Sequence, residues 1–280
     1  MRISEECKDC LSRLSLQAAD LATENETLKQ AAVTRSEMIL RDKFVPGTVS
    51  IVIATSIHDA VKKTTGNPDP YRQMKDVEID VARQLYGLVK DSYSENFQDY
   101  LRLAALGNSI DFFRPIEEVK KEIKCQIITF AIDDSRRLEG KVKNSKLILY
   151  LADNAGEVFF DLPLLKLMRK YSRAVYVVKD APVQNDITLG DIKRAGVENE
   201  IGELMTTGTA TPGIDFEQAS HEFKQAFESA DFVFAKGMGY YETLEELAPR
   251  GRIFFCLKAK CRPVAESLKV PLNSYVALLK

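Results

Sequence analysis

Apolar residues recur with a helical period through the first half of the chain. Two such stripes are Phe97, Tyr100, Leu101 and Ala104, and then Val81, Leu85 and Leu88. Spacings of three and four residues are typical of amphipathic helices that bury one face. Gly107 follows the first stripe, where glycine commonly ends a helix. The pattern therefore predicts a helical N-terminal half.

From about residue 145, short and nearly continuous apolar runs alternate with helical segments. We expect strands at Leu147–Leu151, Ala174–Val178, Phe232–Ala235 and Ile253–Leu257. Continuous apolar strands that alternate with helices indicate a parallel sheet covered on both faces. The predicted fold class is α/β. A helical N-terminal domain (residues 1–143) precedes a Rossmann-like three-layer α/β/α domain with a mostly parallel sheet (residues 144–280).

Composition narrows the function classes. The 280 residues are 45% hydrophobic and 29% charged, as in soluble globular proteins. A net charge of -2 without a block of Lys and Arg argues against a nucleic-acid partner. The apolar runs are too short to span a membrane, and the first residues lack the apolar core of a secretory signal. We expect a cytoplasmic protein with no membrane partner, and a homo-oligomer is compatible with the sequence.

The five cysteines do not form the framework of a secreted protein, because their number is odd and they are widely spread. Cys7 and Cys10 have the C-x-x-C spacing that makes half of a zinc site, but the chain has only two histidines to complete it. An unliganded pair at a helix start is the preferred interpretation. A structural metal and a redox pair remain alternatives.

Polar or glycine-rich sequence follows each predicted strand. Because ligands bind outside the carboxyl ends of parallel strands, these segments should converge on one crevice. Asp153 and Asn154 follow the first strand and Asp186 follows the second. Their oxygens suit a hard divalent cation, and the lack of nearby histidine argues against a zinc-type site. Taken alone, Asp-Asn-Ala-Gly is also a good turn and helix cap.

The same strand ends offer groups that bind phosphate. Ala155 and Gly156 would open a helix, whose free backbone N–H groups attract anions. Lys236 precedes Gly237 and Gly239, which let the backbone approach a ligand closely. Glu157 is an outer base or a first-turn helix residue. Lys258 and Lys260 follow the fourth strand and either reach the crevice or face solvent.

Together these motifs resemble a known family. The segments are "TGNPDPYRQMK", "LGNSID", "LADNAGEVFFD", "PVQNDIT", "TTGTATPG", "FAKGMGYYETL" and "LKAKCRPVA", in that order from residue 65 to 265. The family was long catalogued as domain of unknown function eighty-nine and is described as metal-dependent damage-control phosphatases. The N-terminal C-x-x-C and the compact length are similar to its archaeal branch.

The resemblance implies an activity and a site. It implies hydrolysis of phosphomonoesters of small metabolites such as sugar phosphates, with a manganese, cobalt, nickel or magnesium ion. The family's metal ligands match Asp153, Asn154 and Asp186. Catalytic roles are expected for Asp153, Asn154 and Lys236, with Asp153 as a ligand or, alternatively, the nucleophile. Substrate contacts are expected at Asn108, Asp111, Gly156, Glu157, Lys236 and Lys258.

The chain also departs from the family pattern. Lys179-Asp180 stands where an arginine-glycine pair is expected, and Tyr240 where an asparagine is usual. Pro163 suggests that the helix after the Asp153 loop begins near Asp161. Two other function classes remain: a non-hydrolytic nucleotide- or sugar-phosphate-binding protein, and a carboxyl methyltransferase. The second lacks the expected G-x-G-x-x-G loop after the first strand.

Overall fold

A computed structural model describes residues 1–108, 116–125, 127–247 and 251–280. Its strands are β1 (Phe130–Asp133), β2 (Leu147–Leu151), β3 (Arg173–Val178), β4 (Leu204–Thr206), β5 (Phe232–Lys236), β6 (Ile253–Lys258) and β7 (Tyr275–Leu279). Its helices include α1 (Glu5–Ala22), α2 (Glu26–Lys43), α3 (Ser50–Thr65), α4 (Arg72–Val89), α5 (Phe97–Gly107), α6 (Ile116–Cys125), α7 (Ser135–Lys143), α8 (Val158–Arg169), α9 (Leu189–Ala195), α10 (Glu198–Ile201), α11 (His221–Ser229), α12 (Gly237–Leu244) and α13 (Arg262–Leu268), with 3₁₀ turns η1 (Lys90–Ser92) and η2 (Ala155–Glu157).

The strands form one seven-stranded sheet in the order β1-β7-β6-β5-β2-β3-β4. All neighbouring strands are parallel except β6 and β7, which are antiparallel. The predicted α/β class and mostly parallel sheet are therefore confirmed. The four predicted strands correspond to β2, β3, β5 and β6, at the centre of the sheet. Consequently the ends of β2, β3 and β5 lie side by side.

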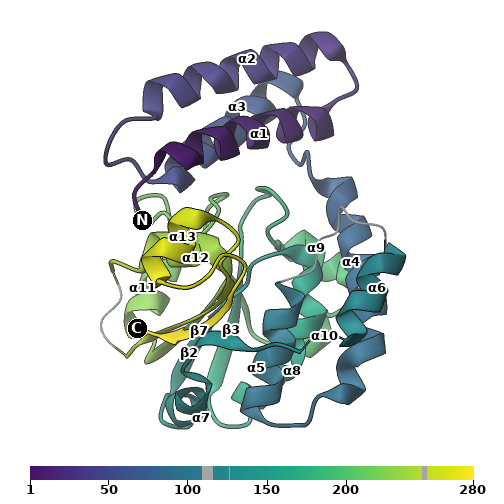
Figure 1. Ribbon diagram of the computed structural model, residues 1–280, viewed down its shortest axis with the longest axis vertical. Coiled ribbons are helices and arrows are strands. Elements are labelled where there is room, and N and C mark those ends of the chain that lie inside the picture. The colour runs from purple at the N-terminus through teal and green to yellow at the C-terminus, as the bar shows by residue number, and fades with distance from the viewer. Residues whose placement is uncertain (109–115, 126, 248–250) are drawn as a thin grey trace.

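Two apolar cores cover the two faces of the sheet, because alternate strand residues point to opposite sides. Ile148 and Tyr150 of β2 belong to the core under the layer that contains α4, α5 and α8. Leu149 and Leu151 belong to the opposite core, with residues of α11, α12 and α13. Figure 1 shows α5 and α8 on one side of the sheet and α12 and α13 on the other.

The first three helices form a separate bundle above the sheet (Figure 1). They pack through two small cores, one rich in alanine and the other in leucine and isoleucine. Ser50 Oγ donates to Oε2 of Glu242 at 2.6 Å, and this bond ties α3 to α12. Within the described residues, no helix is both long and apolar enough to cross a membrane.

The helices of the N-terminal half therefore lie in two different parts of the structure. The bundle α1–α3 stands apart, whereas α4 and α5 pack on the sheet. The sheet itself begins before residue 144, because β1 pairs with β7. The division into a helical domain of residues 1–143 and a Rossmann-like domain of residues 144–280 stays a prediction.

The helix after the Asp153 loop begins earlier than expected. Instead of starting near Asp161, α8 starts at Val158 and contains Pro163 within it. The single 3₁₀ turn η2 precedes α8 directly and continues its path. Pro163 is the sixth residue of α8, beyond the first turn, so it removes a donor that would otherwise bond to the carbonyl of Phe159.

Candidate metal and phosphate site

Backbone hydrogen bonds bring the ends of β2 and β3 together. Asn154 and Asp186 form an isolated antiparallel bridge. On either side of it, Ile187 N donates to Asp153 O at 2.8 Å and Ala155 N donates to Asn185 O at 2.9 Å. The segment after β3 therefore folds back onto the segment after β2. The three predicted metal ligands come from these two segments.

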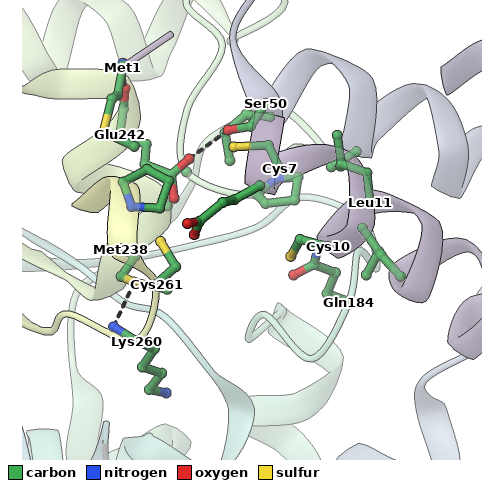
Figure 2. Close-up of a pocket in the computed structure, with 18 of the residues that line it drawn as sticks. Met1, Cys7, Cys10, Leu11, Ser50, Gln184, Met238, Glu242, Lys260 and Cys261 are labelled. Atoms are coloured by element: carbon green, nitrogen blue, oxygen red, sulfur yellow. Dashed lines mark hydrogen bonds between the residues drawn. The ribbon is translucent and has the colours of Figure 1, made fainter. Parts of the chain in front are cut away.

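These side chains line a cavity of about 650 Å³ between the helix bundle and the sheet. Asp153, Asn154, Asp186 and Asn108 line one part of it. Figure 2 shows Cys7 and Cys10 of α1 on one side and Met238, Lys260 and Cys261 on the other. The convergence predicted from the strand ends is present, and the bundle supplies the opposite wall.

Burial disfavours the charged forms of Asp153 and Asp186, the two predicted metal ligands that carry a carboxylate. Burial raises the pKa of Asp153 well above its usual value, and the charges of Glu157 and Asp186 raise it further. Burial also raises the pKa of Asp186 to about 6, although the Lys179 ammonium lowers it. Buried carboxylates that repel one another favour a proton or a bound cation.

Gly237 makes room for Asp153. Its φ of +78° lies in the left-handed region, and a Cβ atom built there would be 2.0 Å from Oδ2 of Asp153. Any other residue would force the carboxylate or the start of α12 to move. The glycine after Lys236 therefore serves the carboxylate, whereas the sequence suggested that it would admit a phosphate.

Lys236 does not line the cavity. It is fully buried, and its Nζ donates to Asp161 Oδ1 at 2.6 Å and to Ala104 O at 2.9 Å. The ammonium also lies 2.7 Å from Oε2 of Glu157. Two of the three ammonium donors are therefore used in hydrogen bonds, and Glu157 is a close ion-pair partner. The expected contact of Lys236 with phosphate stays a prediction that this arrangement does not favour.

The turn after Asp153 is also more enclosed than expected. Gly156 and Glu157 are buried. Glu157 N donates to Asn154 O at 3.1 Å, and Ala155 N is used by Asn185. These two amides are therefore already occupied, which weakens the expectation of a phosphate site at this helix start.

The lysine pair after β6 divides between two environments. Lys258 is half-buried, and its backbone N–H donates to Asn108 Oδ1 at 3.1 Å. Lys260 is exposed, lines the cavity and lowers the pKa of Asp153. Lys260 is therefore better placed to meet a substrate phosphate than Lys236 or Lys258, which do not line the cavity. The expected contact at Asp111 lies outside the described residues.

Lys179 and Tyr240, which both depart from the family pattern, contact each other. Lys179 Nζ donates to Tyr240 Oη at 2.9 Å, and the ammonium lies 4.1 Å from the centroid of the Tyr240 ring. The same ammonium lies 3.5 Å from Oδ2 of Asp186 and donates to Gly213 O. Both side chains are fully buried. Residues that seemed independent in sequence thus form one contact beside a candidate metal ligand.

Cys7 and Cys10 are free thiols near the start of α1. Ser4 N donates to Sγ of Cys7 at 3.4 Å, so this thiol helps to cap the helix. Cys261, also free, lines the same cavity. Among the described residues, no three thiol, imidazole or carboxyl groups lie close enough to hold one ion. The structure adds Cys261 as a neighbour that spacing alone does not predict.

A family model and several known proteins match this chain over nearly its full length. A family model described as the damage-control phosphatase ARMT1-like domain matches residues 3–276. A damage-control phosphatase from Pyrococcus horikoshii is 36% identical, over 99% of this chain and 98% of its own. Another from Archaeoglobus fulgidus is 33% identical, over 99% of both chains. A crystal structure of a DUF89 family protein from Pyrococcus horikoshii matches with a TM-score of 0.92 at 33% identity, covering 100% of this chain and 99% of that chain.

Proposed function

Since the chain belongs to the damage-control phosphatase family, we propose that it is a metal-dependent hydrolase of phosphomonoesters of small metabolites, such as sugar phosphates. The observation that carries this proposal is the bridge between Asn154 and Asp186, which brings two carboxylates and an amide to one cavity. A site of this composition is suited to magnesium, manganese, cobalt or nickel.

Several features of the site fit a divalent cation. Asp153, Asn154 and Asp186 offer oxygen ligands. Burial raises the pKa values of both aspartates, and a bound cation would offset the cost of burying their charge. Gly237 lets Asp153 keep its position at the cavity, because a side chain at residue 237 would collide with the carboxylate. Bound there, a divalent ion would supply Lewis acidity toward the phosphoryl oxygens and acidify a water molecule.

The remaining groups would bind and orient the substrate. Lys260 presents an ammonium to the cavity beside Asp153, where it would attract a phosphate. Arg13 and Arg262 add further positive charge to the lining. The bundle wall, with Leu11 and Ile51, would limit access of bulk water to the reacting phosphate.

The direct test is turnover of a generic aryl phosphate by metal-stripped protein, with each of the four metals added back. We expect turnover only with metal, and loss of that turnover in Asp153→Ala. A panel of phosphometabolites would then define the substrate. Ligand binding without metal and without hydrolysis would instead favour the non-hydrolytic binding protein. Bound S-adenosylmethionine would favour the methyltransferase.

A further inference from the structure

Glu157 joins two asparagine side chains beneath the candidate metal site. It is 1% exposed, and its Oε1 accepts from Asn154 Nδ2 at 2.6 Å and from Asn108 Nδ2 at 2.8 Å. Both amides also donate to Oδ2 of Asp153, at 3.2 and 3.0 Å. The buried Glu157 carboxylate therefore binds both asparagine side chains that donate to Asp153.

These bonds determine which way each amide faces. The oxygen of Asn108 accepts from Lys258 N, so its NH₂ group must face Glu157 and Asp153. The NH₂ group of Asn154 is likewise directed to the two carboxylates. Since an amide has one oxygen and one nitrogen, Oδ1 of Asn154 remains as the atom that can bind a cation.

The core of the domain holds Glu157 in place. Oε2 of Glu157 pairs with Lys236 at 2.7 Å, and Lys236 also binds Asp161. Tyr150 and Tyr176 donate to the two oxygens of Asp161, at 2.8 and 2.9 Å. Glu157 is therefore an acceptor that its ion pair with Lys236 anchors to the sheet.

We infer that Glu157 is a positioning residue of the metal centre, which orients Asn154 and Asn108, and that Lys236 is its internal counter-ion. This inference rests on the proposed function. It assigns Glu157 no contact with substrate, unlike the expectation from sequence. Outer groups of this kind typically change metal affinity about 10–100-fold when they are replaced.

Glu157→Gln tests this role with little change in size. Whichever way the new amide faces, it places NH₂ against another donor, at Lys236 or at the asparagines. We expect the Kd for Mn²⁺, measured by calorimetry, to rise about 10–100-fold. At saturating Mn²⁺, the affinity for inorganic phosphate should be unchanged. Val233→Ala, a destabilising change on β5 in the opposite core, should leave both affinities unchanged.

Other outcomes would overturn the inference. An unchanged Mn²⁺ affinity with weaker phosphate binding would make Glu157 a substrate ligand. Lower thermal stability with both affinities unchanged would make its role purely structural. Equal losses of Mn²⁺ affinity in Val233→Ala would attribute the effect to general destabilisation. If the wild-type protein bound no divalent metal, the proposed function itself would fail, which distinguishes that failure from the others.

Discussion

Gly237 and Asp153 approach so closely that a Cβ atom on the glycine would lie 2.0 Å from the carboxylate oxygen. Gly237 also has a φ of +78°, a backbone angle that residues other than glycine rarely adopt. Two separate constraints therefore require glycine at the junction of β5 and α12. Both act on the position of a candidate metal ligand.

Gly237→Ala should consequently damage the site more than the fold. We expect a loss of about 1–2 kcal/mol in the free energy of unfolding from the backbone conformation. Displacement of Asp153 should reduce metal-dependent turnover on the order of 100-fold. Gly87→Ala is the matched control, because nothing lies within 4 Å of its Cβ position in α4. It should gain about 0.5–1 kcal/mol and keep full activity; equal turnover in the two variants would contradict the role of Gly237.

Lys260→Ala should weaken substrate binding without unfolding the protein, because the side chain is exposed. Loss of a charge-assisted hydrogen bond costs about 1.5–3 kcal/mol, so we expect KM for an aryl phosphate to rise at least about tenfold. Lys8→Ala, on the exposed surface of α1, should leave KM unchanged. Steady-state kinetics in which both variants keep the wild-type KM would remove Lys260 from the substrate site.

Removal of metal should lower stability through the same ligands. A bound ion adds about 2.7 kcal/mol when its concentration is 100 times Kd. Thermal unfolding of metal-stripped protein should therefore shift upward on addition of Mn²⁺. In Asp186→Asn most of this shift should disappear, because one of the two carboxylate ligands is lost. A shift of the same size in the variant would place the stabilising ion elsewhere.

Glu78 predicts a dependence of stability on pH. Burial raises its pKa from 4.5 to about 8, and its carboxyl group contacts Asn185 Nδ2 at 3.0 Å. The folded protein thus keeps a proton that the unfolded chain releases above pH 4.5. Stability should fall as pH rises toward 8, by up to about 1.4 kcal/mol per pH unit.

Urea unfolding between pH 5 and pH 8 measures this slope. Glu78→Gln cannot ionise and should remove the part of the slope due to Glu78, leaving the part due to Asp153 and Asp186. Glu203→Gln should leave it unchanged, because Arg173 lowers the pKa of Glu203, which is then ionised throughout this range. An identical slope in wild type and Glu78→Gln would show that another group is responsible.

The central strands were predictable because each is a continuous apolar run. The shorter β1 and β4 are not continuous runs of this kind, and β7 is an antiparallel exception to the pattern. Of the stripe predicted in α4, Leu85 is fully buried and Val81 packs on the core, but Leu88 is 44% exposed. The buried face of α4 also contains Lys75 and Glu78. Their burial is tolerable because Lys75 forms an ion pair with Asp69 and Glu78 accepts a hydrogen bond from Asn185.

The site was predictable as a meeting of strand ends, but the direction of its lysines was not. Lys236 shares strand parity with Phe232 and Phe234, which face the core beneath α5 and α8. The predicted strand ended at Ala235, so Lys236 was not recognised as the next core-facing position of β5. Lys260 lies beyond β6, where strand parity no longer constrains the side chain. Contacts between distant segments, such as Lys179 with Tyr240, have no signal in a single sequence.

The most direct measurement is anomalous X-ray scattering from crystals soaked in Mn²⁺. We expect one strong manganese peak within ligand distance of Asp153, Oδ1 of Asn154 and Asp186. The peak should disappear in crystals of Asp153→Ala. A peak beside Cys7, Cys10 and Cys261, or no peak at the ends of β2 and β3, would contradict the assignment of the metal centre.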